Sequence, residues 1–163
     1  MSGLDLDRYI ELYRRTVTDT ALFIVKNPAD AEDIAQDVFL KLFTYQGSFN
    51  SDEHVKAWLI RCTINHSFNH LKSHWNKNYV SIDSLGEMQD NKTNDDNGIR
   101  TALMSLNPKL RTTLYLYYYE GYGVAEIAGM LRISAAAVKW RLKRGRDKLR
   151  DVLDDERSLD HGL

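Results

Sequence analysis

Apolar residues recur along most of the chain at the spacing of an amphipathic helix, and the alternation typical of strands is weak throughout. The clearest case follows Asn27, where one stripe is apolar and the other positions are mostly acidic or amide; the stripe comprises Ile34, Ala35, Val38, Phe39 and Leu42. Similar spacing predicts further helices over residues 4–25, 55–75, 99–106, 108–119, 124–131 and 135–153. The pattern therefore predicts an all-α protein.

Local signals divide this helical pattern into two parts. Both prolines, Pro28 and Pro108, follow an asparagine, and an Asn-Pro pair is typical of a helix start because Asn caps the helix and Pro fits its first position. Residues 81–98 (SIDSLGEMQDNKTNDDNG) are too polar to offset the entropy of ordering them, so they predict a flexible linker. A long loop within one domain is the alternative, but such loops are uncommon. We expect domains over 1–80 and 99–153, joined by the linker, with an acidic tail over 154–163.

The last two helices of the second domain fit a helix-turn-helix, with a turn of three residues between Leu131 and Ala135. Apolar residues occupy the inward positions of both helices and of the turn, and Ser134 is suited to cap the second helix. The inward set is Ile127, Ala128, Leu131, Ile133, Val138, Leu142 and Leu149. The second helix is thus placed to enter a DNA major groove.

The charge distribution supports this interpretation, although the net charge of the chain is only −1. Residues 99–150 carry 11 basic and 3 acidic side chains, a net of +8, whereas residues 1–82, 83–98 and 151–163 carry −1, −4 and −4. A solvated basic helix in an αα-hairpin is the bland alternative, but a basic block on a second helix-turn-helix helix is what phosphate binding requires. The predicted DNA contacts there are Ser134, Lys139, Trp140, Arg141, Lys143, Arg144 and Arg146.

Composition narrows the class of protein. Hydrophobic residues make up 43% and charged residues 28%, and no apolar run approaches the roughly 20 residues that span a bilayer. The N-terminus is acidic and amphipathic rather than signal-like, and a single cysteine excludes an internal disulfide. We expect a soluble cytoplasmic protein with no membrane insertion.

Three stretches together resemble one known family. The run GVAEIAGMLRISAAAVKWRLKRGRDKLRDVL, preceded by LNPKLRTTLYLYYYEGY, closely resembles the −35-reading region 4 of extracytoplasmic-function (ECF) sigma factors, a group of the bacterial sigma-70 family. NPADAEDIAQDVFLKLF resembles their region 2.2, and HVKAWLIRCTINHSFNHLKS resembles regions 2.3 and 2.4. The two blocks cover about three quarters of the chain in the family's order.

This resemblance implies two further sites in the first domain. Region 2.2 would dock on the clamp helices of the polymerase β′ subunit through an acidic face beside apolar residues: Asp30, Asp33, Gln36, Asp37, Leu40 and Phe43. Without the resemblance, these residues would indicate only a solvated helix face. The loop and helix that follow would capture an unstacked base of the −10 element, using Phe49, Lys56, Arg61, Asn65, Asn69 and Lys72. Trp58 is interpreted as core or as a packing platform for the loop.

Two departures from the family pattern concern the helix-turn-helix. Arg132 stands where the turn usually has glycine, which puts the backbone there in question. The second helix opens with three alanines and carries Trp140 at a position that is often small, so the −35 preference stays open.

Other chemistry receives weaker support. His66, His70 and His74 have a spacing that metals accept, but no carboxylate or thiol other than Cys62 is expected on that face, so we favour a solvent- or DNA-facing stripe and no metal. Cys62 is expected to be a buried small hydrophobe. The tyrosines of the 108–119 helix are expected to pack: Tyr115, Tyr117, Tyr118 and Tyr119.

Three other classes of protein remain as alternatives. An ordinary helix-turn-helix regulator explains residues 108–150 but leaves the first domain unexplained, and binding to core polymerase separates the two. An enzyme lacks a phosphate loop or a nucleophile–base arrangement, and an adaptor without DNA contact does not explain the basic helix. The sequence therefore predicts a non-enzymatic sigma factor without cofactors. Its partners would be core RNA polymerase, promoter DNA and, by resemblance only, an anti-sigma factor.

Overall fold

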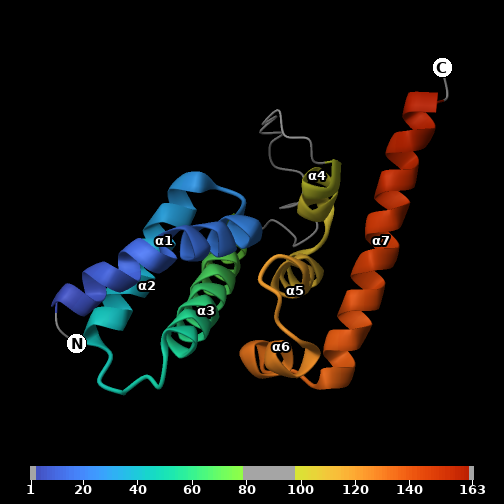
Figure 1. The fold of residues 1–163 in the computed structure, drawn as a ribbon. Coiled ribbons are helices and arrows are strands. Elements are labelled where there is room, and N and C mark those ends of the chain that lie inside the picture. Colours follow the sequence, from blue (N-terminus) through green and yellow to red (C-terminus); the bar gives the residue numbers. More distant parts are fainter. Residues whose placement is uncertain (1–2, 79–97, 162–163) are drawn as a thin grey trace. The chain divides into compact units, whose positions relative to one another are not determined.

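The computed structural model describes residues 3–78 and 98–161, with side chains for residues 5–74 and 98–155. These residues form seven α-helices and no strand, which confirms the all-α prediction (Figure 1). The chain divides into two compact units, Met1–Lys77 and Asn78–Leu163. The expected linker lies outside the described residues, apart from Gly98, which begins a helix. Within the described part of the chain, no helix is long and apolar enough to cross a membrane.

Unit 1 contains α1 (Gly3–Val25), α2 (Pro28–Thr44) and α3 (Asp52–Asn78). Its core joins all three helices and contains the whole apolar stripe predicted for α2. The buried residues of this core are Val17, Ala21, Ala31, Ile34, Ala35, Val38, Phe39, Leu42, Val55, Leu59 and Cys62. The polar positions of α2 are consequently left on its outer face.

Two sets of polar contacts set where these helices begin. The Asn27 side chain accepts a hydrogen bond from the Asp30 amide at 3.0 Å, which confirms the predicted cap of α2. Arg8 forms an ion pair with Asp52, and the Tyr13 hydroxyl donates to the Asp52 carbonyl at 3.1 Å. Since Asp52 is the first residue of α3, these contacts tie α1 to the end of the α2–α3 loop.

Unit 2 contains α4 (Gly98–Ser105), α5 (Pro108–Tyr118), α6 (Val124–Leu131) and α7 (Ala135–His161). Helix α7 packs against the other three. At its crossing with α5, a Cβ on Gly145 would lie 2.8 Å from Leu114 Cδ1, so a larger residue there would require the buried Leu114 side chain to shift. Helix α7 is also longer than predicted, because no glycine or proline interrupts the chain between Gly145 and Gly162.

A buried arginine holds α5 against the end of α4. The Arg111 guanidinium is 2% exposed and donates a hydrogen bond to the Leu106 carbonyl at 2.6 Å. Burial lowers the pKa of Arg111 to about 10, so the side chain stays charged at neutral pH. Arg111 belongs to the basic block of the sequence, but its side chain is buried and serves the fold.

The prediction for the tyrosines of α5 was wrong for three of four. Tyr115 is buried, whereas Tyr117, Tyr118 and Tyr119 are exposed. Helix α5 is covered from Leu110 to Leu116, and its last turn emerges from the unit. Helical periodicity alone does not reveal where the covering helices stop.

Candidate functional site

Helices α6 and α7 form the predicted helix-turn-helix. Ile127, Val138 and Leu142 are buried between the helices of unit 2, as the pattern predicted. The Ser134 hydroxyl accepts a hydrogen bond from the Ala137 amide at 3.0 Å, so it caps the start of α7. Ser134 was also predicted to contact DNA, and its exposed position at the helix start leaves that prediction open.

Arg132 adopts the backbone conformation that glycine usually supplies. Its φ of 57° and ψ of 46° lie in the left-handed region. The chain thereby reverses tightly, and the Ile133 amide donates to the Ala128 carbonyl at 3.1 Å. Arg132 therefore adopts a conformation that glycine would adopt without strain, and the arginine carries that strain.

The N-terminal half of α7 presents a basic and aromatic surface. Lys139, Lys143 and Arg144 are exposed, and Trp140 is 62% exposed. These are the four positions predicted to reach base edges. A tryptophan so exposed beside three cations is unusual for a helix that only packs in a core, because large apolar surface in water is costly.

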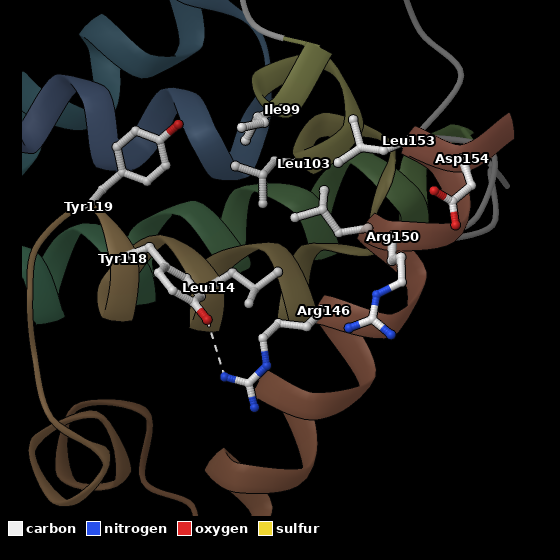
Figure 2. Close-up of a pocket in the computed structure, with 10 residues that line it drawn as sticks. Ile99, Leu103, Leu114, Tyr118, Tyr119, Arg146, Arg150, Leu153 and Asp154 are labelled. Carbon is white, nitrogen blue, oxygen red and sulfur yellow. Dashed lines mark hydrogen bonds between the residues drawn. The ribbon is translucent and has the colours of Figure 1, made fainter. Parts of the chain in front are cut away.

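The two remaining arginines of the predicted set are partly engaged within unit 2. Arg141 is half-buried, and burial lowers its pKa. Arg146 donates to the Tyr118 hydroxyl at 3.2 Å, and this hydrogen bond raises the pKa of Arg146. Arg146 and Arg150 border a cavity of about 480 Å³. Figure 2 shows the apolar residues of α4, α5 and α7 that line it, including Ile99 and Leu103. The DNA contacts of Arg141 and Arg146 stay predictions.

The outer face of α2 combines exposed apolar and acidic side chains. Leu40 is 63% exposed and Phe43 is 49% exposed, next to exposed Asp33, Gln36 and Asp37. Five of the six predicted polymerase contacts are therefore brought together on one accessible helix face. Asp30 differs, because it is half-buried and turned toward α3.

Asp30 interacts with the histidine stripe of α3. His70 Nε2 lies 3.1 Å from Asp30 Oδ2, and the rings of His70 and His74 stack with centroids 6.5 Å apart. The expectation that no carboxylate lies near the stripe was wrong, since the partner comes from a different helix, 40 residues away. Among the described residues, no group of three or more His, Cys, Asp or Glu side chains is arranged to hold a metal.

The α2–α3 loop carries an aromatic cluster around Phe49. The Phe49 ring centroid lies 5.1 Å from that of Tyr45, 5.1 Å from His54 and 5.8 Å from Trp58. Trp58 also packs against the core of unit 1, which confirms its interpretation as a platform for the loop. Tyr45 and His54 were missed, although their ring-bearing side chains flank Phe49 closely in the sequence.

A polar face of α3 continues from this cluster. Trp58, Asn65 and Lys72 are spaced by seven residues, so they share one side of the helix at intervals of about 10 Å. Asn65, Asn69 and Lys72 are exposed, whereas Lys56 and Arg61 are half-buried. The face offers amide donors and acceptors with few charges.

Cys62 lies on the inner side of the same helix. Its side chain is 6% exposed, which confirms the expectation of a buried small hydrophobe. Burial raises the pKa of the Cys62 thiol, so it stays protonated and unreactive at neutral pH.

Comparisons with known proteins match both units to one family. The model for sigma-70 region 2 matches residues 9–77, and the model for sigma-70 region 4 matches residues 97–149. The chain is 25% identical over 163 residues to the ECF RNA polymerase sigma factor SigW of Bacillus subtilis, covering 90% of this chain and 87% of SigW. It is 26% identical over 149 residues to SigM of Mycobacterium tuberculosis, covering 90% and 76%.

Solved structures share the fold. The sigma factor RpoE from Bartonella quintana, in complex with the anti-sigma factor NepR, matches with a TM-score of 0.73 and 19% identity, covering 92% of this chain and 97% of that one. CnrH in complex with the cytosolic domain of CnrY matches with a TM-score of 0.67 and 19% identity, covering 94% and 90%.

Proposed function

The chain belongs to the ECF group of sigma-70 factors, and from this premise we propose which of its surfaces bind polymerase and which bind each promoter element. Sigma factors of this family bind RNA polymerase and recognise promoters, and they are transcription regulators rather than enzymes. We propose that α2 docks on core polymerase, α7 reads the −35 duplex, and α3 with its preceding loop captures a −10 base. We also propose that the protein acts in the cytoplasm and has no catalytic role of its own.

The assignment of polymerase docking rests on the outer face of α2, the single observation that best distinguishes this chain from an ordinary helix-turn-helix regulator. Leu40 and Phe43 stay in water although the helix has a complete buried stripe on its other side. An apolar anchor beside carboxylates suits a partner with a basic rim around an apolar pocket. The clamp helices of the polymerase β′ subunit, named by the family resemblance, are the partner we propose.

The first experiment measures the affinity of the full chain for core polymerase. Reversing both carboxylates, in Asp33→Lys with Asp37→Lys, should weaken association about 100-fold or more, because like charges would then meet in a desolvated contact. Glu11→Lys is the matched control, since Glu11 is equally exposed but lies on α1. Equal affinity of the double variant and the control would reject the assigned face.

The assignment of −35 reading rests on the capped start and exposed surface of α7. Lys139, Trp140, Lys143 and Arg144 are proposed to meet base edges, while Arg141 and Arg146 contact phosphates. For Arg146 this requires that phosphate compete with the Tyr118 hydroxyl. A charge-assisted bond to phosphate is stronger than one to a neutral hydroxyl, so the exchange is favourable.

The assignment of −10 opening rests on the Phe49 cluster and on the polar face of α3. Phe49 is proposed to stack on an unpaired base, while Asn65 and Asn69 bond its Watson–Crick edge. Lys56, Arg61 and Lys72 would hold the backbone of that strand. Because the face has few charges, it depends on polymerase and α7 to bring the promoter near.

An inhibitory partner is also proposed. Both solved relatives named above are complexes, one with the anti-sigma factor NepR and one with the cytosolic domain of CnrY. We expect an anti-sigma factor of this chain to cover the exposed apolar residues of α2 and thereby exclude core polymerase. Such an inhibitor should bind the Asp33→Lys, Asp37→Lys variant less tightly than the wild-type chain, as core polymerase should.

A further inference from the structure

We propose that His54 is a positioning residue for the α2–α3 loop, residues 45–51. It holds both the Phe49 ring and the peptide bond that follows Phe49. The inference rests on the proposed role of Phe49 in capturing a −10 base, and it extends that role to a residue outside the predicted site. His54 stands on the first turn of α3, immediately after the loop.

His54 contacts the loop through two different parts of its ring. Its Nδ1 accepts a hydrogen bond from the Asn50 amide at 3.1 Å. The ring also meets Phe49 edge-on, with centroids 5.1 Å apart and planes inclined by 79°. The Asn50 amide belongs to the peptide bond that leaves Phe49, so one side chain restrains the backbone and the ring of the same residue.

The backbone of His54 is itself fixed. Its amide donates to the Ser51 hydroxyl at 3.1 Å, which caps the first turn of α3. Asp52, two residues before His54, is anchored as well. Its side chain forms an ion pair with Arg8, and its carbonyl accepts a hydrogen bond from the Tyr13 hydroxyl. The imidazole therefore extends from a rigid helix start back over the loop.

Among the described contacts, the other rings around Phe49 make no hydrogen bond to the loop backbone, although the Tyr45 ring lies against Gly47. Trp58 supports Phe49 from the core side, and Tyr45 lies against both rings at 5.1 Å. None of these ring contacts is a hydrogen bond to the Asn50 amide. The hydrogen bond to His54 restrains that amide, so Phe49 is held in one orientation before any base arrives.

His54 is exposed, so its effect on the position of the loop can be measured separately from any effect on the stability of unit 1. An exposed side chain contributes little to the core, so replacing it should leave unfolding of unit 1 nearly unchanged. The loss should instead appear where an ordered loop is needed, when an unstacked base must find its pocket.

The test compares three substitutions in full-length holoenzyme, on a duplex promoter that the wild-type holoenzyme opens. His54→Asn keeps an acceptor close to the position of Nδ1, His54→Phe keeps a ring against Phe49, and His54→Ala removes both. Open complexes are measured by permanganate reactivity of −10 thymines. We expect Asn and Phe each to lower opening about three- to tenfold and Ala to lower it further, since one hydrogen bond or one ring contact is lost at a time.

Two controls make each outcome decisive. Glu53→Gln alters an exposed neighbour on the same turn and should open promoters normally. Phe49→Ala is measured alongside: if it is defective while all His54 variants open normally, the positioning role is wrong and the base-capture proposal stands. If Phe49→Ala is normal, base capture itself fails, and the inference fails with it. A fall in the melting temperature of His54→Ala that matches its opening defect would show a structural role and overturn the proposal.

Discussion

Helices α3 and α7 are both 27 residues long and are both proposed to meet promoter DNA, yet their surfaces differ. The first 16 residues of α7 carry seven basic and one acidic side chain, whereas the first 16 of α3 carry two of each. Helix α3 is preceded by a loop with an aromatic cluster, and α7 by a tight turn with a serine cap. Basic side chains bind the phosphates of any duplex, whereas aromatic rings and side-chain amides bind a base only after it has left the stack. We therefore propose that unit 2 supplies affinity for duplex DNA and that unit 1 supplies strand opening.

Among variants that separate α3 from α7, the largest expected effect comes from removing base capture. Phe49→Ala with Asn65→Ala should lower open-complex formation about 10–100-fold, because stacking is worth about 1–3 kcal/mol per base and the amide contact is lost as well. Binding of the holoenzyme to the −35 duplex should stay nearly unchanged. Filter binding to closed complexes and permanganate reactivity measure the two steps separately. A loss of closed complexes as large as the loss of opening would contradict the proposal that unit 1 opens the strands while unit 2 binds the duplex.

A smaller effect, of opposite kind, is expected on α7. Lys143→Ala with Arg144→Ala should weaken duplex binding about tenfold and reduce discrimination between the −35 element and a scrambled duplex, because both side chains are proposed to meet base edges. The matched control is Lys109→Ala, an exposed lysine at the start of α5, outside the predicted DNA-binding set. Unchanged discrimination by the double variant would mean that these side chains do not read base edges.

The smallest effect concerns the turn that presents α7. Arg132→Gly should stabilise unit 2 by about 0.5–1 kcal/mol, because glycine adopts the left-handed conformation without strain and part of that gain is offset by its entropy in the unfolded chain. Hydrogen exchange of the buried α6 and α7 amides should slow, while amides of α2 should not change. Faster exchange in α7 would show that the Arg132 side chain stabilises the turn by more than its backbone costs.

Helix positions could be predicted because their signals are local. The two Asn-Pro pairs marked the starts of α2 and α5, and the stripe from Ile34 to Leu42 marked the buried face of α2. An exposed face follows once a buried face is known, which is why Leu40 and Phe43 could be assigned correctly to the outer surface. Periodicity did not indicate that α7 continues past Leu153, because residues 154–161 are almost all polar or charged and show no apolar stripe.

Contacts between distant residues could not be predicted in the same way. The Asp30–His70 and Tyr118–Arg146 pairs join side chains 40 and 28 positions apart, and each depends on how two helices cross. The His54 contact spans only four residues, but it depends on the path of the loop, which no periodic pattern describes. These contacts decide which members of a predicted site are accessible.

The division of labour between the units is tested most directly with each double variant assembled separately into holoenzyme. Each holoenzyme is added to one promoter in two forms, as a duplex and with a pre-melted −10 element. Permanganate footprints and base preference in the bubble are read on each template. We predict that the Lys143, Arg144 variant is defective at duplex binding yet keeps normal base preference in the bubble. We also predict that the Phe49, Asn65 variant binds the duplex normally but loses base preference even when the strands are already apart. If both variants fail identically at duplex binding, residues 44–75 are not a separate opening module and the proposed division of labour is wrong.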